Sequence, residues 1–192
     1  PQEVDAEDAA VKVSIHKLFG GHSGLEINQG RCNANKAMAR IVQDAIANFE
    51  ACLSSWKGGD MRNAIPAFCD VVLTLPKENV EAFKEVVDEW RQTLKEEYYP
   101  IEQTFELKVE DVELPTHIVP AEIQDNLVDA LCACHNGVFR MIPEVPNIVE
   151  TSSNLSIVEI GEGKAQFLLL IRSSRDSMRE CCAETLESAF SM

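Results

Sequence analysis

The chain has 192 residues, of which 45% are hydrophobic and 26% are charged, and its formal net charge is −15. This composition is typical of a soluble globular protein, and the acidity argues against nucleic acid as a partner because phosphate binding needs clustered Lys and Arg. The acidity also disfavours an anionic membrane surface, and no apolar run approaches the roughly 18 residues of a membrane span. The sequence starts at Pro1, without the basic-then-apolar pattern of a secretory signal, and stops at Met192 within a helical pattern. We therefore expect a segment of a longer cytoplasmic protein.

The cysteines fit free thiols better than a metal site. Their number is odd, and most fall on predicted apolar faces of helices or strands. One residue separates Cys132 from Cys134, which is shorter than the spacing usual in zinc sites, and no second pair follows at a suitable distance. Buried free thiols in a reducing cytosol explain this pattern. The seven cysteines are Cys32, Cys52, Cys69, Cys132, Cys134, Cys181 and Cys182.

The chain opens with a strand pattern and changes to a helical one. Apolar and polar residues alternate over residues 11–16, as in a half-buried strand, and glycines interrupt the pattern at residues 20–24. Residues 33–49 then repeat apolar side chains along one helical face. The first two predicted elements are therefore a strand and a helix.

Four further predicted elements follow the first strand and helix. Residues 52–56 and 67–75 predict strands separated by a turn at residues 57–62, and residues 80–94 predict a second helix. Alternation at residues 105–109 predicts another strand. The order βαββαβ indicates a ferredoxin-like unit over residues 9–117, with both helices on one face of an antiparallel sheet.

Residues 118–192 resemble a partial second pass through the same scheme. A helical face over residues 123–134 is followed by strands at 148–160 and 165–172, joined by Gly161-Glu162-Gly163, and by a last helix from Met178. We expect this αββα portion to extend the first sheet. The predicted fold is an α+β, two-layer sandwich in which residues 1–192 form one continuous domain.

Three segments carry candidate chemistry. Glycines flank His22 in Gly20-Gly21-His22-Ser23-Gly24, which leaves the imidazole unshielded and able to donate a hydrogen bond to a substrate oxygen. The alternative is a glycine-rich turn with a solvated His22, and the spacing does not match a phosphate-binding loop.

Asn63 is the second candidate, because it lies between an Arg and a rigid Ala-Ile-Pro entry to a strand. Its amide offers both a donor and an acceptor to a ligand. Equally, Asn63 fits a hairpin turn, where Asn is common for conformational reasons. The polar stretch at residues 151–154 is neutral between ligand contact and structure.

Arg172 is the third candidate, because it ends the very apolar strand segment at residues 167–171. A guanidinium there suits recognition of a carboxylate. Alternatively, Arg172 and Arg175 simply frame the start of the last helix.

Known catalytic patterns are otherwise missing. The chain has four histidines, and neither a two-histidine zinc motif nor a serine nucleophile elbow occurs. We expect no metal ligands in this chain, and we expect the chain alone to be inactive.

Taken together, the candidate segments resemble those of the aminoacyl-histidine dipeptidases, also called peptidase D or Xaa-His dipeptidases, a family of co-catalytic zinc exopeptidases. The resemblance runs from about Val11 to Phe190. The segments that carry it are Phe19–Lys36 (FGGHSGLEINQGRCNANK), Gly58–Pro66 (GGDMRNAIP), Thr151–Leu155 (TSSNL) and Arg172–Ser174 (RSS).

This resemblance implies a lid and dimerisation domain whose partner domain, absent here, binds two zinc ions and hydrolyses Xaa-His and related dipeptides. His22 would stabilise the oxyanion, in many relatives across a dimer interface, while Asn63 would hold the substrate backbone and Arg172 its carboxylate. The chain departs from the wider group at residues 71–75, where relatives often have an Arg, and Arg172 would take over that role. Two other hypotheses are a non-catalytic, ferredoxin-like module for small-ligand binding or dimerisation, and a purely structural dimerisation insert.

Overall fold

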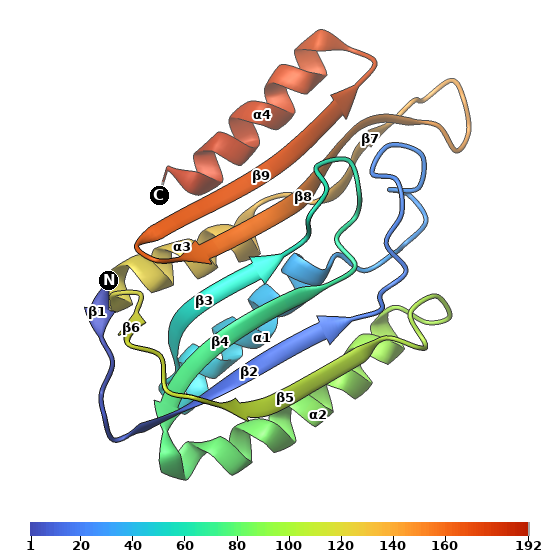
Figure 1. Cartoon of the computed structure of the whole chain (residues 1–192). Helices are drawn as coiled ribbons and strands as arrows, with labels where there is room; N and C mark the ends of the chain where they lie inside the picture. The colour runs from blue at the N-terminus through green and yellow to red at the C-terminus, as the bar shows by residue number, and fades with distance from the viewer. Residues whose placement is uncertain (192) are drawn as a thin grey trace.

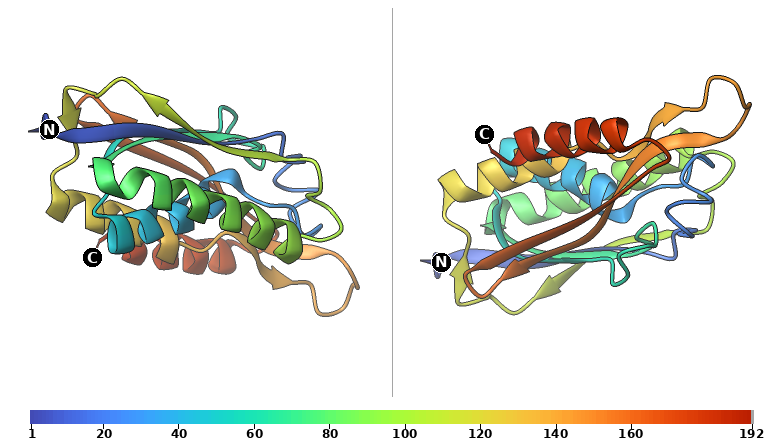
Figure 2. Two further views of the ribbon diagram at one scale, coloured as in Figure 1. Left: turned by 90° about the horizontal axis from the view of Figure 1, so that it is seen from below. Right: turned by 90° about the horizontal axis from the view of Figure 1, so that it is seen from above.

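The computed structural model describes residues 1–191 and centres on one antiparallel sheet. Its seven strands run in the order β5–β2–β4–β3–β8–β7, with β9 paired to β8, and the helices cover one face of the sheet (Figure 1, Figure 2). The elements are β1 (Gln2–Glu3), β2 (Asp8–His16), α1 (Ala34–Phe49), β3 (Cys52–Gly58), β4 (Cys69–Pro76), the 3-10 turn η1 (Lys77–Asn79), α2 (Val80–Glu97), β5 (Glu106–Val112), β6 (His117–Ile118), α3 (Ala121–Ala133), β7 (Gly137–Met141), β8 (Val149–Gly161), β9 (Lys164–Ser173) and α4 (Asp176–Phe190).

The first half of the chain is the predicted ferredoxin-like unit. Its strands lie in the order β5–β2–β4–β3 and all pair antiparallel. On β2, Val11, Val13 and Ile15 are buried against the helices, whereas the alternate residues face away. The alternation read from the sequence therefore places one face of the sheet in the core.

The second half extends the same sheet, as predicted. Strand β8 pairs with the edge of β3 through Trp56–Gly58, and β9 then pairs along the length of β8. The structure adds strand β7, which the sequence did not predict, along the other half of β8. The pairs of β7 shift register twice, and such an irregular short strand leaves no clear alternation to read.

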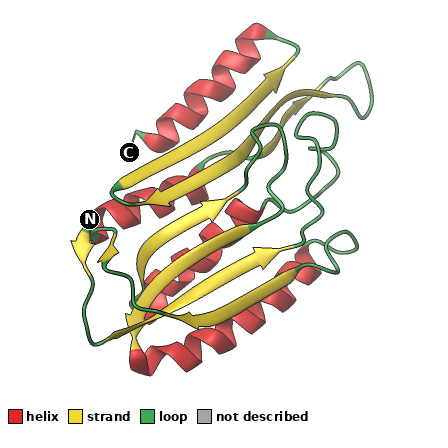
Figure 3. Cartoon of the chain, viewed as in Figure 1, coloured by secondary structure: helices red, strands yellow, loops and turns green. Residues whose placement is uncertain are grey.

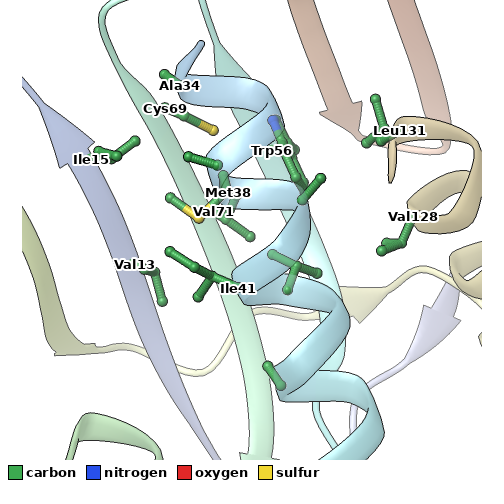
Figure 4. Packing of buried hydrophobic residues seen from close by; sticks show 14 of the residues in the cluster. Val13, Ile15, Ala34, Met38, Ile41, Trp56, Cys69, Val71, Val128 and Leu131 are labelled. Atoms are coloured by element: carbon green, nitrogen blue, oxygen red, sulfur yellow. The ribbon is translucent and has the colours of Figure 1, made fainter. Parts of the chain in front are cut away.

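Helix α1 lies at the centre of the core. Met38 and Ile41 on this helix point toward Val13 and Val71 on the sheet (Figure 4). Asn33 caps the helix, because its Oδ1 accepts hydrogen bonds from the backbone N–H groups of Asn35 at 2.9 Å and Lys36 at 3.2 Å. The same cluster includes residues from α3, β8 and α4, so the two halves share one core.

All seven cysteines are free. Burial raises the pKa of Cys69 and raises that of Cys32 to about 12, so neither is a reactive thiolate at neutral pH. Residues 1–191 contain no cluster of three or more His, Cys, Asp or Glu side chains that could hold a metal ion. Among the helices of these residues, none is long and apolar enough to cross a membrane.

Four loops gather at one end of the sheet, which we call the site end. They are residues 17–33, 59–68, 98–105 and 142–148, drawn in green in Figure 3. The β8–β9 turn and the pair β1–β6 lie at the opposite end (Figure 1). A cavity of about 640 Å³ also lies at that opposite end, lined in part by Ile118, Leu127 and Ile160. None of the three candidate residues lines this cavity.

Candidate functional site

The His22 loop and the Asn63 loop pair with each other. His22 forms an antiparallel bridge with Ala64, the Ser23 N–H donates to the Asn63 carbonyl at 2.9 Å, and the Ile65 N–H donates to the Gly21 carbonyl at 2.8 Å. Two segments about forty residues apart in sequence therefore lie side by side.

Backbone N–H groups near His22 fix the orientation and the tautomer of its imidazole ring. The N–H groups of Gly24 and Leu25 each donate to Nδ1 at 3.1 Å. Because Nδ1 is the acceptor of both bonds, a neutral ring carries its proton on Nε2. The half-buried His22 ring thus offers an Nε2–H donor on the side away from its own loop.

An ion pair supports the loop beneath His22. Glu26 accepts the His22 backbone N–H at 2.6 Å and a bond from Arg31 at 2.7 Å, while Arg31 also donates to the Gly20 carbonyl at 2.7 Å. The bond from the His22 backbone, followed by the one from Arg31, lowers the pKa of Glu26. Gly21 has φ +115°, and a Cβ there would lie 1.9 Å from Arg31 Nη1, so only glycine fits.

A second carboxylate, that of Glu102, ties the two ends of the His22 loop together. Its Oε2 accepts the Phe19 N–H at 3.0 Å, and its Oε1 accepts the Cys32 N–H at 3.1 Å. The residue is 3% exposed. Sequence reasoning missed Glu102, because a single acidic residue in a loop carries no signal of its distant partners.

Gly24 lies between the side chains of Arg172 and His22. A Cβ on Gly24 would lie 3.0 Å from Cδ and Nε of Arg172 and 3.1 Å from Cε1 of His22. Arg172 is exposed and lies opposite Ser152 on β8. Among residues 1–191 its guanidinium has no hydrogen bond or ion pair, whereas Arg175 pairs with Glu150 at 3.2 Å. Arg175 is therefore held by an ion pair, whereas Arg172 has none among residues 1–191.

Asn63 is exposed on the neighbouring loop, and its amide makes no hydrogen bond within the described part of the chain. Strand β8 holds this loop in place: Asn154 Nδ2 donates to the Ala64 carbonyl at 2.7 Å, and Ser156 Oγ donates to the Arg62 carbonyl at 2.5 Å. Asn154 and Ser156 are buried. Asn154 and Ser156 of β8 thus support the Asn63 loop.

The structure brings His22, Asn63 and Arg172 to one end of the sheet. They come from three segments, and none of the three side chains has an ion-pair partner in residues 1–191. Together they offer an imidazole N–H, an amide and a guanidinium, which suits a small ligand with a carbonyl oxygen and a carboxylate.

Comparison with known proteins identifies the domain. Residues 13–102 match the family described as the peptidase dimerisation domain. The cytosol non-specific dipeptidase of Escherichia coli (strain K12) is 30% identical over 187 residues, which is 97% of this chain and 39% of that protein. The crystal structure of aminoacylhistidine dipeptidase from Vibrio alginolyticus matches with a TM-score of 0.96 and 34% identity, over 99% of this chain and 39% of that one.

The fold and these matches define the class: residues 13–102 match the peptidase dimerisation domain family, and nearly the whole chain shares its fold with part of the Vibrio enzyme. More particularly, the chain is similar to one segment of two dipeptidases, the Escherichia coli protein and the Vibrio enzyme. The chain spans 39% of the length of each of these two relatives.

Proposed function

We propose that this chain is the lid and dimerisation domain of a cytoplasmic zinc dipeptidase that hydrolyses Xaa-His and related dipeptides. The names of the two relatives, a cytosol non-specific dipeptidase and an aminoacylhistidine dipeptidase, support this activity. In this proposal the two zinc ions belong to a separate catalytic domain, where they would supply an activated water and polarise the scissile carbonyl. The domain would also pair two copies of the enzyme into a homodimer.

The observation that carries the proposal is the fixed donor on His22. An oxyanion needs a hydrogen-bond donor that is already aimed before the reaction starts, because reorientation would cost free energy in the transition state. The two backbone bonds to Nδ1 hold the ring, and they leave Nε2–H free for the developing negative charge. His22 would therefore act as the oxyanion donor.

The neighbouring side chains would hold the substrate. Arg172 would bind the terminal carboxylate through its planar guanidinium. Asn63 would hydrogen-bond the substrate backbone with an amide that has no partner in the described residues. The site would orient a dipeptide between these two contacts and His22, and closure of the lid would exclude water.

Substitution of His22 tests the catalytic role. In the full-length enzyme, His22→Ala should lower kcat by roughly 100-fold or more, the cost of one lost oxyanion donor. Zinc content should stay unchanged. His117→Ala is the matched control, because His117 is an exposed histidine at the opposite end of the sheet. A near-normal rate for His22→Ala would favour the alternative, a binding or dimerisation module without a catalytic role.

Substitution of Arg172 tests the carboxylate contact. Arg172→Ala should raise KM for dipeptides by roughly 30-fold, or about 2 kcal/mol, because a charged hydrogen bond to the carboxylate is lost. Dipeptide amides, which lack that carboxylate, should show no such increase. Arg179→Ala is the control, because Arg179 is an exposed arginine on α4 that pairs with Asp176. An equal KM for wild type and Arg172→Ala would remove this role.

A further inference from the structure

Glu150 is a buried carboxylate at the start of β8, and two arginines flank it. The residue is only 3% exposed. Arg175 Nε donates to its Oε2 at 3.2 Å, and Arg140 Nη1 lies 3.5 Å from its Oε1. Both arginines are exposed, one directly before α4 and the other on β7. A carboxylate that is removed from water needs such partners, because an unpaired buried charge strongly destabilises a fold.

Arg172, the proposed contact for the substrate's carboxylate, lies on the same face of the sheet as Glu150. The hydroxyls of Thr151 and Ser173 hydrogen-bond each other at 2.8 Å, so these two side chains share one face. Because side chains alternate along a strand, Glu150 and Arg172 point to the opposite face. The register pairs Arg172 with the residue two positions after Glu150. The two residues are therefore diagonal neighbours across β8 and β9, a spacing that a long side chain can span.

Arg172 nevertheless does not pair with this carboxylate. Its guanidinium has no ion pair among residues 1–191, and its side chain instead passes Gly24 of the His22 loop. Asp60 and Glu144 are exposed on neighbouring loops, also without an ion pair in the described part of the chain. Water screens the attraction between such exposed charges. Glu150 lacks this screening, so it is the stronger competitor for the Arg172 guanidinium.

We propose that Arg140 and Arg175 are positioning residues that keep Arg172 free for the substrate. They neutralise both oxygens of Glu150, so the buried carboxylate does not draw Arg172 away from the His22 loop. A guanidinium held by Glu150 would have to leave that ion pair before it could bind a dipeptide, and the substrate would bind more weakly. The inference rests on the proposed function, in which Arg172 binds the terminal carboxylate.

Three variants of the full-length enzyme separate this role from a structural one. Arg175→Met keeps an aliphatic side chain but frees Oε2 of Glu150, so KM for dipeptides should rise roughly tenfold with kcat unchanged. Glu150→Gln should leave KM near the wild-type value, because a neutral amide does not compete for Arg172. Glu150→Gln combined with Arg175→Met should restore the wild-type KM. If the two single variants are equally impaired and the combination is no better, the ion pair is merely structural and the proposal is overturned.

Arg140 should contribute from the other carboxylate oxygen. Arg140→Met added to Arg175→Met should raise KM further, toward the roughly 30-fold expected for Arg172→Ala. Dipeptide amides, which lack the terminal carboxylate, should show neither increase, and an equal rise for amides would contradict the proposal. Arg179→Met is the matched control, because Arg179 is an exposed arginine on α4 that pairs with Asp176. If the variant that lacks both arginines does not fold, Arg175→Met alone decides the question.

A crystal structure of the full-length Arg175→Met enzyme provides a readout that does not depend on activity. The Arg172 guanidinium should lie within hydrogen-bond distance of Glu150, and an unchanged position would overturn the proposal. Arg172→Ala separates the two proposals. If it raises KM while Arg175→Met is normal, only the positioning role is wrong. If it leaves KM unchanged while Arg172 and Glu150 pair in the variant structure, the substrate contact in the proposed function is wrong.

Discussion

At the level of single residues, the candidate site depends on acidic side chains that never touch a substrate in the proposed reaction. Glu26 and Glu102 accept hydrogen bonds from backbone N–H groups of the His22 loop, and Arg31 forms an ion pair with Glu26. A glycine-rich loop has many accessible conformations, so these bonds select one of them. The position of the His22 ring is thus set by residues up to eighty positions away.

The lowered pKa of Glu26 predicts how the loop responds to pH. A carboxylate whose folded pKa lies below its ordinary value of 4.5 stabilises the fold above that value, and this stabilisation disappears as the pH falls through the folded pKa. The His22 amide resonance in ¹⁵N NMR spectra should therefore titrate with a midpoint below 4.5. In Glu26→Gln this titration should be absent. A midpoint at or above 4.5 would contradict the hydrogen bond from the His22 backbone.

At the level of elements, Lys36 connects the start of α1 to the end of α3. Its Nζ donates to the carbonyls of Leu131 and Cys132 at 2.7 Å and of Cys134 at 2.8 Å. The last carbonyls of a helix lack partners within the helix and carry partial negative charge, so an ammonium group satisfies both needs. This contact fixes the second half of the chain on the first.

Removal of the Lys36 ammonium should destabilise the fold. Lys36→Met keeps much of the aliphatic length but leaves three carbonyls without their donor, and we expect a loss of about 2–4 kcal/mol in the free energy of unfolding. Urea titration followed by far-UV circular dichroism measures this loss. Lys57→Met, at an exposed lysine of β3 that has no ion pair among residues 1–191, should change stability by no more than about 0.5 kcal/mol. Similar values for the two variants would show that Lys36 is not a structural cap.

At the level of the whole molecule, the seam between β3 and β8 joins the two halves into one sheet. Three residue pairs bridge it, and α1 and α3 pack side by side beneath. Leu53 from the first half and Leu155 from the second belong to the same buried cluster. We therefore infer that residues 9–117 and 118–191 unfold together.

Tryptophan fluorescence can test this cooperativity, because both tryptophans, Trp56 and Trp90, lie in the first half. Leu155→Ala, at a fully buried position of the second half, should lower the free energy of unfolding by about 2–5 kcal/mol. The fluorescence midpoint in urea should shift together with the far-UV circular dichroism midpoint. An unshifted fluorescence midpoint would mean that the halves are independent domains.

The sequence by itself determined the order and type of the main elements and the ferredoxin-like class. Alternation on β2 and helical periodicity on α1 are local properties, because side-chain direction repeats every two or 3.6 residues. The resemblance around His22, Asn63 and Arg172 likewise depended on contiguous motifs.

The tertiary structure decided what local patterns cannot encode. Only the fold assigns Asn154 of β8 to support of the Asn63 loop, brings Glu102 to both ends of the His22 loop, and pairs that loop with the Asn63 loop. These features join residues from 40 to 90 positions apart, and a hydrogen bond of that kind exists only after the chain has folded.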